Sequence, residues 1–136
     1  MKGYKIGINK DTLEFVLIEL EVPEEYPGKI IYEYEVKILD PAYPRIINQY
    51  RANVARVLKI QKTTTAINAF VGSAFSLYDM HFYYHPGEIV YPDSFDPDPD
   101  AVCTNGIHFF GTVKDAIEYI EDGWVRYLYS FILDGI

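Results

Sequence analysis

The chain has 136 residues, of which 49% are hydrophobic, 16% aromatic and 24% charged, a profile that indicates one compact domain and excludes a disordered tail. Twelve Lys and Arg stand against twenty Asp and Glu, so the net charge is −8, which argues against general nucleic-acid binding through phosphate contacts. The one cysteine, Cys103, excludes an intrachain disulfide. We expect a single domain over residues 1–136, with no standard signal sequence and no membrane span.

The charge is distributed unevenly along the chain. Residues 1–68 carry ten Lys/Arg and nine Asp/Glu, whereas residues 69–136 carry two and eleven, a net of −9. An acidic surface of this kind favours contact with basic patches on other proteins. No acidic residue lies between Asp40 and Asp79. The cations inside that window are Arg45, Arg51, Arg56, Lys59 and Lys62. The window predicts an anion-binding site, with unrelated surface cations as the alternative.

Two segments in the first third of the chain alternate in hydrophobicity as half-buried strands do. They are residues 13–22, which end at Pro23, and residues 30–39. Pro27-Gly28 between them is a turn signal. We therefore expect the two strands to form an antiparallel hairpin or to be near neighbours in one sheet.

The segment over residues 45–61 has two interpretations, and both stay open. Its apolar residues recur at helical spacing, although residues 54–60 are rich in the β-branched residues of a strand. Further along, residues 75–84 and 89–91 are predicted strands, joined by a tight turn at His85-Pro86-Gly87-Glu88. Residues 92–99 contain three prolines among aspartates and predict an ordered or extended loop.

The C-terminal part predicts a short strand over residues 106–110 and then a helix. Thr112 is placed to cap that helix, Asp115 lies near its positive end, and Gly123 can end it. Residues 124–133 have the aromatic and branched content of a closing strand, with a second helix as the alternative. The fold class expected is α+β, mainly antiparallel sheet with one helix near the C-terminus.

One stretch of sequence carries a resemblance to a known family. Residues 82–119 contain Gly-Glu-x-Val-x-Pro-Asp-Ser-Phe-Asp and then Cys-x-x-Gly-Ile-His-Phe-Phe, starting at Cys103. With Arg51-Ala52 and Tyr78-Asp79 upstream, this frame resembles an uncharacterised domain of large DNA viruses and phages. The resemblance implies an accessory protein acting in the cytoplasm of an infected host cell. It also favours a strand for the second half of residues 45–61.

Several side chains could carry chemistry, and each has a structural alternative. His108 could serve as a base or as a donor to an anion, but we expect it to anchor the loop over residues 92–100 through a carboxylate or a carbonyl group. Cys103 is expected to be a small buried thiol. A zinc site at His81, His85, Cys103 and His108 and a calcium site at Asp93, Asp96, Asp98 and Asp100 both lack the usual spacing, so no metal or cofactor is predicted.

The function expected is that of a binding module. Its working surface lies where residues 50–60 meet residues 82–110, because the family motif and the cationic window fall there together. The ligand is either a nucleotide-like small molecule, whose sequestration would blunt a host defence signal, or a host protein. The candidate ligand-binding residues are Arg51, Arg56, Tyr78, Phe82, Tyr84 and His108.

The alternative function is enzymatic. Residues 106–119 are similar to the middle of ADP-ribosyltransferase-like folds, in which an arginine binds NAD and a glutamate on a strand activates the ribose. Arg51 and either Glu118 or Glu121 would take those roles. Both glutamates fall on a predicted helix, so we expect no NAD turnover and assign no catalytic residue.

Overall fold

The computed structural model describes residues 1–36, 49–63, 70–101 and 105–135. Their strands are β1 (Lys2–Asn9), β2 (Phe15–Glu21), β3 (Glu33–Val36), β4 (Gln49–Ala52), β5 (Ala55–Lys62), β6 (Ala74–Ser76), β7 (Asp79–Tyr84), β8 (Ile89–Val90) and β9 (Ile107–Phe110). The helical segments are α1 (Val113–Glu118), the short 3₁₀ helix η1 (Tyr119–Glu121) and α2 (Gly123–Asp134). All strand pairs are antiparallel, which confirms the predicted α+β class.

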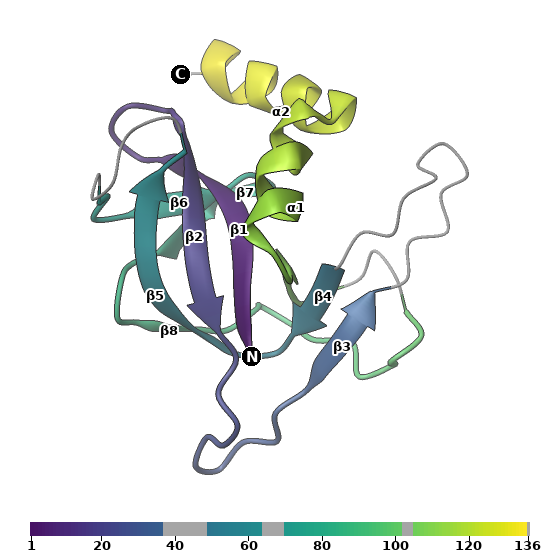
Figure 1. The fold of residues 1–136 in the computed structure, drawn as a ribbon. Coiled ribbons are helices and arrows are strands. Elements are labelled where there is room, and N and C mark those ends of the chain that lie inside the picture. Colours follow the sequence, from purple (N-terminus) through teal and green to yellow (C-terminus); the bar gives the residue numbers. More distant parts are fainter. Residues whose placement is uncertain (37–48, 64–69, 102–104, 136) are drawn as a thin grey trace.

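The strands form one twisted sheet that divides at β1 (Figure 1). Its main path is β3-β4-β9-β1-β2-β5-β8, while β6 also pairs with β1 and carries β7 on its other side. Two strands thus share one edge of β1: β9 meets it at Tyr4, and β6 meets it from Gly7 to Asn9. The β9 and β6 branches separate beyond this edge.

The sequence pattern does not predict β1, whose composition includes two glycines. The structure explains both of them by close packing. A Cβ atom on Gly3 would lie 2.0 Å from Cδ2 of Phe109, and one on Gly7 would lie 2.6 Å from Cδ1 of Ile18. Bulky side chains from neighbouring strands occupy the space above these residues, so β1 combines low strand propensity with a central place in the sheet.

Both strands predicted in the first third of the chain exist, but the expected pairing is wrong. β2 lies between β1 and β5, and β3 pairs with β4 at the far end of the sheet. The hairpin partner of β2 is β1, through a turn in which the Asn9 side chain accepts a hydrogen bond from the Asp11 N–H group at 2.9 Å. This local turn places β1 along one edge of β2. Because β5 occupies the other edge, β3 cannot pair with β2.

Within residues 45–61, the part from residue 49 onward is strand and not helix. β4 and β5 are separated by a kink at Asn53, whose side chain accepts from the Tyr32 N–H group at 2.9 Å and donates to the Ile30 carbonyl at 2.7 Å. The kink shifts the alternation by one residue between Ala52 and Ala55, and both are buried. Because the side-chain alternation of β5 is shifted by one residue relative to that of β4, the apolar residues of the two strands together recur at a spacing similar to that of a helix.

The predicted closing strand over residues 124–133 is wrong, because these residues form α2. Val125 and Ile132 are buried against Ile8, Phe75 and Leu77, at a spacing that belongs to a helix. Gly123 begins this helix and does not end the previous one. The predicted cap of α1 is confirmed, since the Thr112 hydroxyl accepts from the Asp115 N–H group at 3.2 Å.

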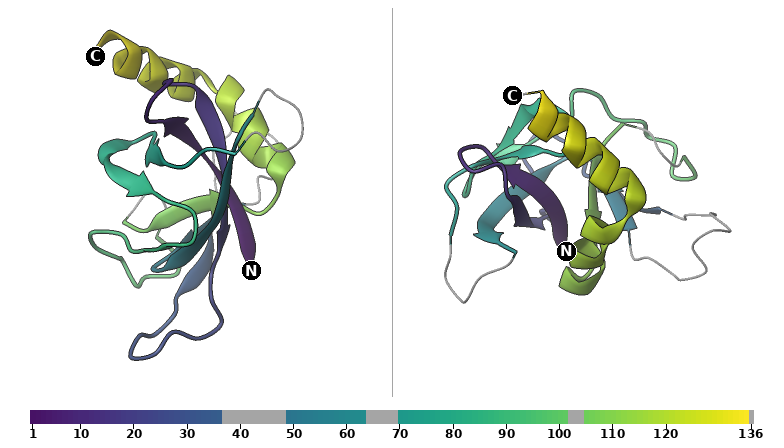
Figure 2. Two further views of the ribbon diagram at one scale, coloured as in Figure 1. Left: turned by 90° about the vertical axis from the view of Figure 1, so that its left-hand side faces the viewer. Right: turned by 90° about the horizontal axis from the view of Figure 1, so that it is seen from above.

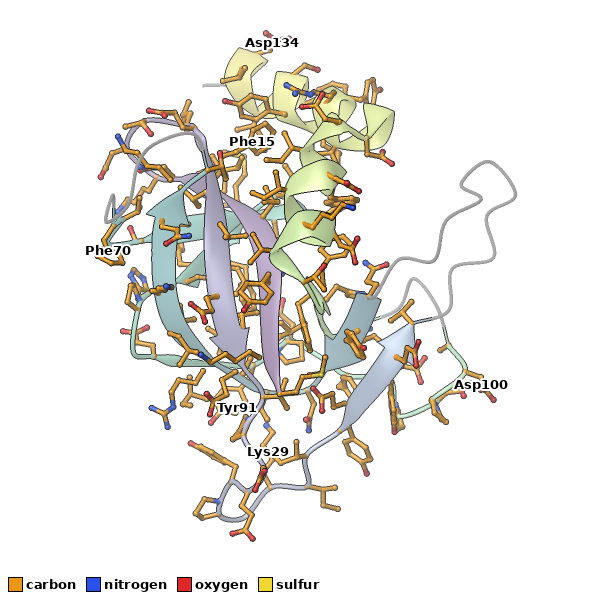
Figure 3. All side chains as sticks on the ribbon, viewed as in Figure 1. Phe15, Lys29, Phe70, Tyr91, Asp100 and Asp134 are labelled. Atoms are coloured by element: carbon orange, nitrogen blue, oxygen red, sulfur yellow. The ribbon has the colours of Figure 1, made fainter. Side chains whose placement is uncertain are left out.

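The two helices cover different parts of the sheet. α1 packs near Ile6, Leu17 and Phe110 on one face, and α2 lies across the end of the sheet where β1 turns into β2 (Figure 2). Phe15 lies at this end of the sheet, below α2 (Figure 3). The centre of its ring is 4.2 Å from that of Tyr129. The opposite face holds the largest apolar cluster, which includes Ile18, Leu20 and Ile60. Within the described residues, no helix combines the length and the apolar character that crossing a bilayer requires.

Candidate binding pocket

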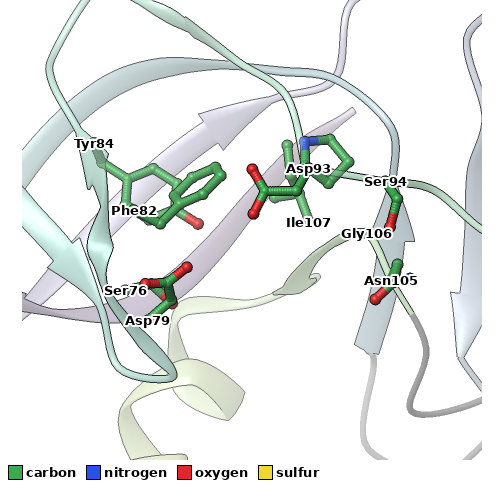
Figure 4. Close-up of a pocket in the computed structure, with 10 residues that line it drawn as sticks. Ser76, Asp79, Phe82, Tyr84, Asp93, Ser94, Asn105, Gly106 and Ile107 are labelled. Atoms are coloured by element: carbon green, nitrogen blue, oxygen red, sulfur yellow. The ribbon is translucent and has the colours of Figure 1, made fainter.

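A pocket of about 160 Å³ lies where the two branches of the sheet separate. On one side it is lined by Ser76 of β6 and by Asp79, Phe82 and Tyr84 of β7. The residues on the other side are Pro92, Asp93, Ser94, Asn105, Gly106 and Ile107. The division of the sheet at β1 therefore creates a hollow between segments that lie far apart in the chain (Figure 4).

The pocket combines carboxylates with aromatic surface. The Asp93 carboxylate points toward the rings of Phe82 and Tyr84, and Asp79 lies near Ser76 on the β7 side (Figure 4). Among the lining residues that the structure describes, none is Lys, Arg or His. Asp79 accepts a hydrogen bond from the His81 N–H group at 2.9 Å, whereas Asp93 has no ion pair or hydrogen bond with the rest of the described chain. The pocket therefore presents negative charge beside a ring.

Two further polar groups in the wall are held in place by hydrogen bonds. The Tyr84 side chain is buried, and its hydroxyl accepts from the Lys5 ammonium of β1 at 2.7 Å. Ser76 is 8% exposed, and its Oγ accepts from the Tyr78 N–H group at 3.2 Å. Each hydroxyl keeps its own hydrogen for donation. The wall thus offers fixed hydroxyl donors as well as carboxylate acceptors.

The loop on the other side of the pocket is anchored by Arg51 of β4. This side chain is 0% exposed. One terminal nitrogen, Nη1, donates to the carbonyl groups of Asp96 at 2.6 Å and Asn105 at 3.0 Å, and Nη2 donates to the Asp98 carbonyl at 2.8 Å. The guanidinium also lies 4.7 Å from the centre of the Phe95 ring. Arg51 is therefore engaged in holding residues 95–98 and Asn105 against the sheet.

The anchored loop also stabilises itself. The Asp96 carboxylate accepts from the Asp98 N–H group and the Asp98 carboxylate accepts from the Asp100 N–H group, each at 3.0 Å, a side-chain turn that aspartate favours. The Tyr34 hydroxyl donates to the Pro97 carbonyl at 2.8 Å. The part of the chain that the structure describes contains no cluster of three His, Cys, Asp or Glu arranged for a metal ion. These aspartates shape the loop, and the loop in turn holds Asp93 and Ser94 at the pocket.

Residues 1–116 match the model of a family of unknown function, DUF5758. The chain belongs to this family. The DUF5758 match contains all the residues that line the pocket and ends inside α1, so that η1 and α2 lie beyond it. No curated protein and no solved structure matches the chain.

The structure brings two of the six candidate binding residues of this DUF5758 protein into the pocket, namely Phe82 and Tyr84. Tyr78 is exposed next to β7, and its hydroxyl contacts that of Tyr119. Arg56 is exposed on β5, opposite Ile89. Arg51 is buried beneath the acidic loop, and His108 is half-buried opposite it in the β4–β9 pair. The hydrogen bonds described above that hold this loop come from Arg51 and Tyr34.

Sequence reasoning missed the polar half of the pocket: Ser76, Asp79, Ser94 and Asn105, with Asp93 considered only as a loop carboxylate. Asp79 and Asp93 are 14 positions apart and meet only because β7 folds back toward the loop. The signal in the sequence that could have identified this half of the pocket is Asp79, which follows a turn and begins an aromatic strand. Cys103, which the motif and the zinc hypothesis involve, lies outside the described residues.

The residues considered for NAD chemistry do not line the pocket. Glu118 of α1 forms an ion pair with Lys114 at 4.0 Å, and Glu121 of η1 forms one with Arg126 at 2.7 Å. Both glutamates lie in helical segments, as the sequence predicts. Arg51, the third residue considered, is enclosed by loop carbonyl groups.

Proposed function

We propose that this protein is a binding module whose pocket takes a cationic side chain of a partner protein. The observation that carries the proposal is the presence of Asp79 and Asp93 at one hollow with the Phe82 ring, with no basic residue among the described residues that line it. An ammonium group placed there gains charge-assisted hydrogen bonds from the carboxylates and attraction to the face of the ring. The free carboxylate of Asp93 has no competing cation in the described part of the chain.

The size of the pocket supports a side chain rather than a whole small molecule. Its volume of about 160 Å³ is close to that of an engineered cavity of about 150 Å³ that holds benzene. Pockets that enclose drug-sized ligands measure about 300–1,000 Å³. A lysine side chain matches the smaller size, and a nucleotide exceeds it.

Of the two ligand classes expected from the sequence, a protein partner has the better support. A nucleotide-like anion needs a cation at its phosphate, but Arg51 already binds three carbonyl groups and Arg56 does not line the pocket. The net charge of −9 over residues 69–136 adds long-range attraction for a basic surface.

We place this partner in a host cell. The resemblance to domains of large DNA viruses and phages supports an accessory protein that binds a host protein in the cytoplasm and counteracts host defence. The test is affinity capture from host lysate with the wild-type protein and with Asp93→Asn. A host protein lost from the capture by this single change supports the role, and identical captures contradict it.

The pocket itself is tested by chemical-shift titration of the folded protein with n-butylammonium chloride, which reproduces the end of a lysine side chain. We expect concentration-dependent shifts at the amides of Phe82, Asp93 and Ser94, and a loss of affinity of about 5-fold or more in Asp93→Asn. The matched control is Asp100→Asn, which removes the same charge from the same loop at a position that does not line the pocket (Figure 3).

Two outcomes contradict the proposal. One is the absence of butylammonium shifts at these amides. The other is an equal or stronger response of the same amides to adenosine monophosphate, which would favour the nucleotide-like ligand. Phe82→Leu adds a second readout, because removal of the ring face should weaken the binding of the ammonium group while the two carboxylates remain.

A further inference from the structure

We infer that the partner binds as an extended segment that adds a strand to the free edge of β7 and directs a lysine or arginine side chain into the pocket. This inference rests on the proposed function, and it specifies how the partner chain is held. Main-chain pairing with an exposed strand supplies affinity, and pockets for alternate side chains supply specificity.

β7 is an edge strand, and its pairing with β6 contains a register shift between Phe75 and Ser76. Among the described strands it pairs with β6 alone. Its six residues, Asp-Met-His-Phe-Tyr-Tyr, contain no lysine and no proline, the residues that natural proteins place on edges to prevent pairing. Met80 and Tyr83 are each 40% exposed. β7 therefore presents unpaired backbone groups together with apolar side chains.

The other two edges of the sheet differ from β7. β8 has only two residues, and short edge strands are a common protection. β3 has four residues, and its exposed positions are occupied by Glu33 and Glu35. The other described edge strands of this sheet thus do not share the apolar character of β7. This difference favours a partner that binds at β7.

The edge and the pocket are built from the same strand. Asp79, Phe82 and Tyr84 of β7 line the pocket, so a segment paired with β7 runs along its rim. Neighbouring strands lie about 4.8 Å apart, and their side chains alternate between the two faces. A long basic side chain on the pocket face can span this distance, whereas the adjacent residues of the segment point to the other face.

That other face requires apolar residues in the partner. Tyr83 packs there against Phe75 with ring centres 6.4 Å apart. A β-branched or aromatic residue beside it gains a cross-strand contact. The segment that fits has a basic residue flanked by apolar residues. A second copy of this chain is a poorer occupant, because each copy carries a net charge of −8.

The probe is the capped synthetic peptide Thr-Val-Lys-Val-Thr-Val-Thr, titrated against the full chain and followed by fluorescence anisotropy. Two matched peptides accompany it: one in which norleucine replaces the lysine, and one in which alternate backbone amides are N-methylated. We expect each change to weaken binding at least 10-fold, because one removes the charge and the other removes main-chain donors. Hydrogen exchange at the amides of β7 should slow when the unmodified peptide binds.

Strand addition and the pocket can fail separately. If N-methylation in either alternating register leaves the affinity unchanged, or β7 amides exchange as before, strand addition is wrong while butylammonium binding still supports the pocket. If Asp93→Asn changes neither butylammonium nor peptide affinity, the proposed function is wrong. Protection of β7 that appears without peptide and rises with protein concentration, together with a dimeric mass in light scattering, identifies a second copy as the occupant and overturns the inference.

Discussion

Arg51 shows how one buried charge organises a loop that contains no strand or helix. A buried guanidinium usually pairs with a carboxylate, but this one donates to the carbonyl groups of Asp96, Asp98 and Asn105. Its Nε is buried without a hydrogen-bond partner in the described part of the chain. Gly106 is required beside it, because a Cβ atom there would lie 2.5 Å from Cγ of Arg51. Arg51 thus fixes the loop through backbone carbonyl groups.

Replacing Arg51 by lysine should destabilise the protein. An ammonium group cannot reproduce the planar fork that reaches three carbonyl groups, and the loss of these hydrogen bonds should lower the free energy of unfolding by about 1–3 kcal/mol. Urea unfolding measures this loss. The control is Arg56→Lys at an exposed position, expected to stay within about 0.5 kcal/mol of the wild type.

The same variant should expose the loop to proteolysis. A protease specific for Asp and Glu should cleave Arg51→Lys within residues 93–100 faster than it cleaves the wild type, under conditions in which both are folded. Equal cleavage rates and an unchanged unfolding midpoint would show that Tyr34 and the aspartate turns hold the loop without Arg51.

Among the elements, β1 depends on small residues at two positions. Gly3→Ala would bring a methyl group to 2.0 Å from the buried Phe109 ring, and we expect a loss of about 1–3 kcal/mol from this overpacking. The measurement is again urea unfolding. Gly72→Ala is the control, since a Cβ atom there meets nothing within 4 Å. A comparable loss in both variants would contradict the packing explanation, because the effect of Gly→Ala on the entropy of the unfolded chain favours folding.

α2 presents a second pair of matched positions, Ile132 and Leu133. Ile132 is 6% exposed and packs in the cluster with Phe75, whereas Leu133 is 46% exposed. Ile132→Ala should lower the free energy of unfolding by about 2–4 kcal/mol and Leu133→Ala by less than about 1 kcal/mol. Thermal melts of both variants test this, and similar midpoints would mean that α2 does not dock on the sheet in solution.

The elements also show what the sequence can and cannot predict. Alternation predicts β2 and β3, and the cap at Thr112 predicts the start of α1, because these signals are local. For the residues of α2 the sequence favours a strand, with a helix as the alternative, because aromatic and branched residues are common in both. Only the burial of one face against Ile8 and Phe75 distinguishes the helix. The sequence does not predict β1 as a strand, because its two glycines lower the strand propensity. The residues that require these glycines, Phe109 and Ile18, are more than ten positions away in the chain.

The pocket was predictable only in part, for the same reason. Phe82 and Tyr84 belong to an aromatic strand that the pattern reveals. The sequence does not predict the partners of Arg51, because a loop more than 40 residues away in the chain supplies the carbonyl groups that accept its hydrogen bonds. Contacts between residues this far apart in the chain produce no periodic pattern in the sequence from which they could be predicted.

On the scale of the whole molecule, the uneven charge should control how quickly a basic partner associates. The carboxylates near the pocket belong to the half of the chain with a net charge of −9. Raising the salt concentration shortens the Debye length from about 10 Å at 0.1 M to about 3 Å at 1 M. We expect the association rate of the lysine peptide to fall steeply over this range and its dissociation rate to change less. Stopped-flow fluorescence separates the two rates, and salt-independent association would contradict electrostatic steering.

The shared edge of β1 also has a consequence for synthesis. β1 and β2 can pair as soon as residue 21 is made, but the strands that complete the other edge of β1 end at residues 76 and 110. At about 5–20 residues per second, translation of the intervening chain takes roughly 5–20 s. During that interval the nascent hairpin exposes unpaired backbone groups on β1 and the apolar side chains of β2, and the other edge of β2 also stays unpaired until β5 is made. The β1–β2 hairpin is therefore the part of this sheet that a ribosome-associated chaperone has most reason to cover.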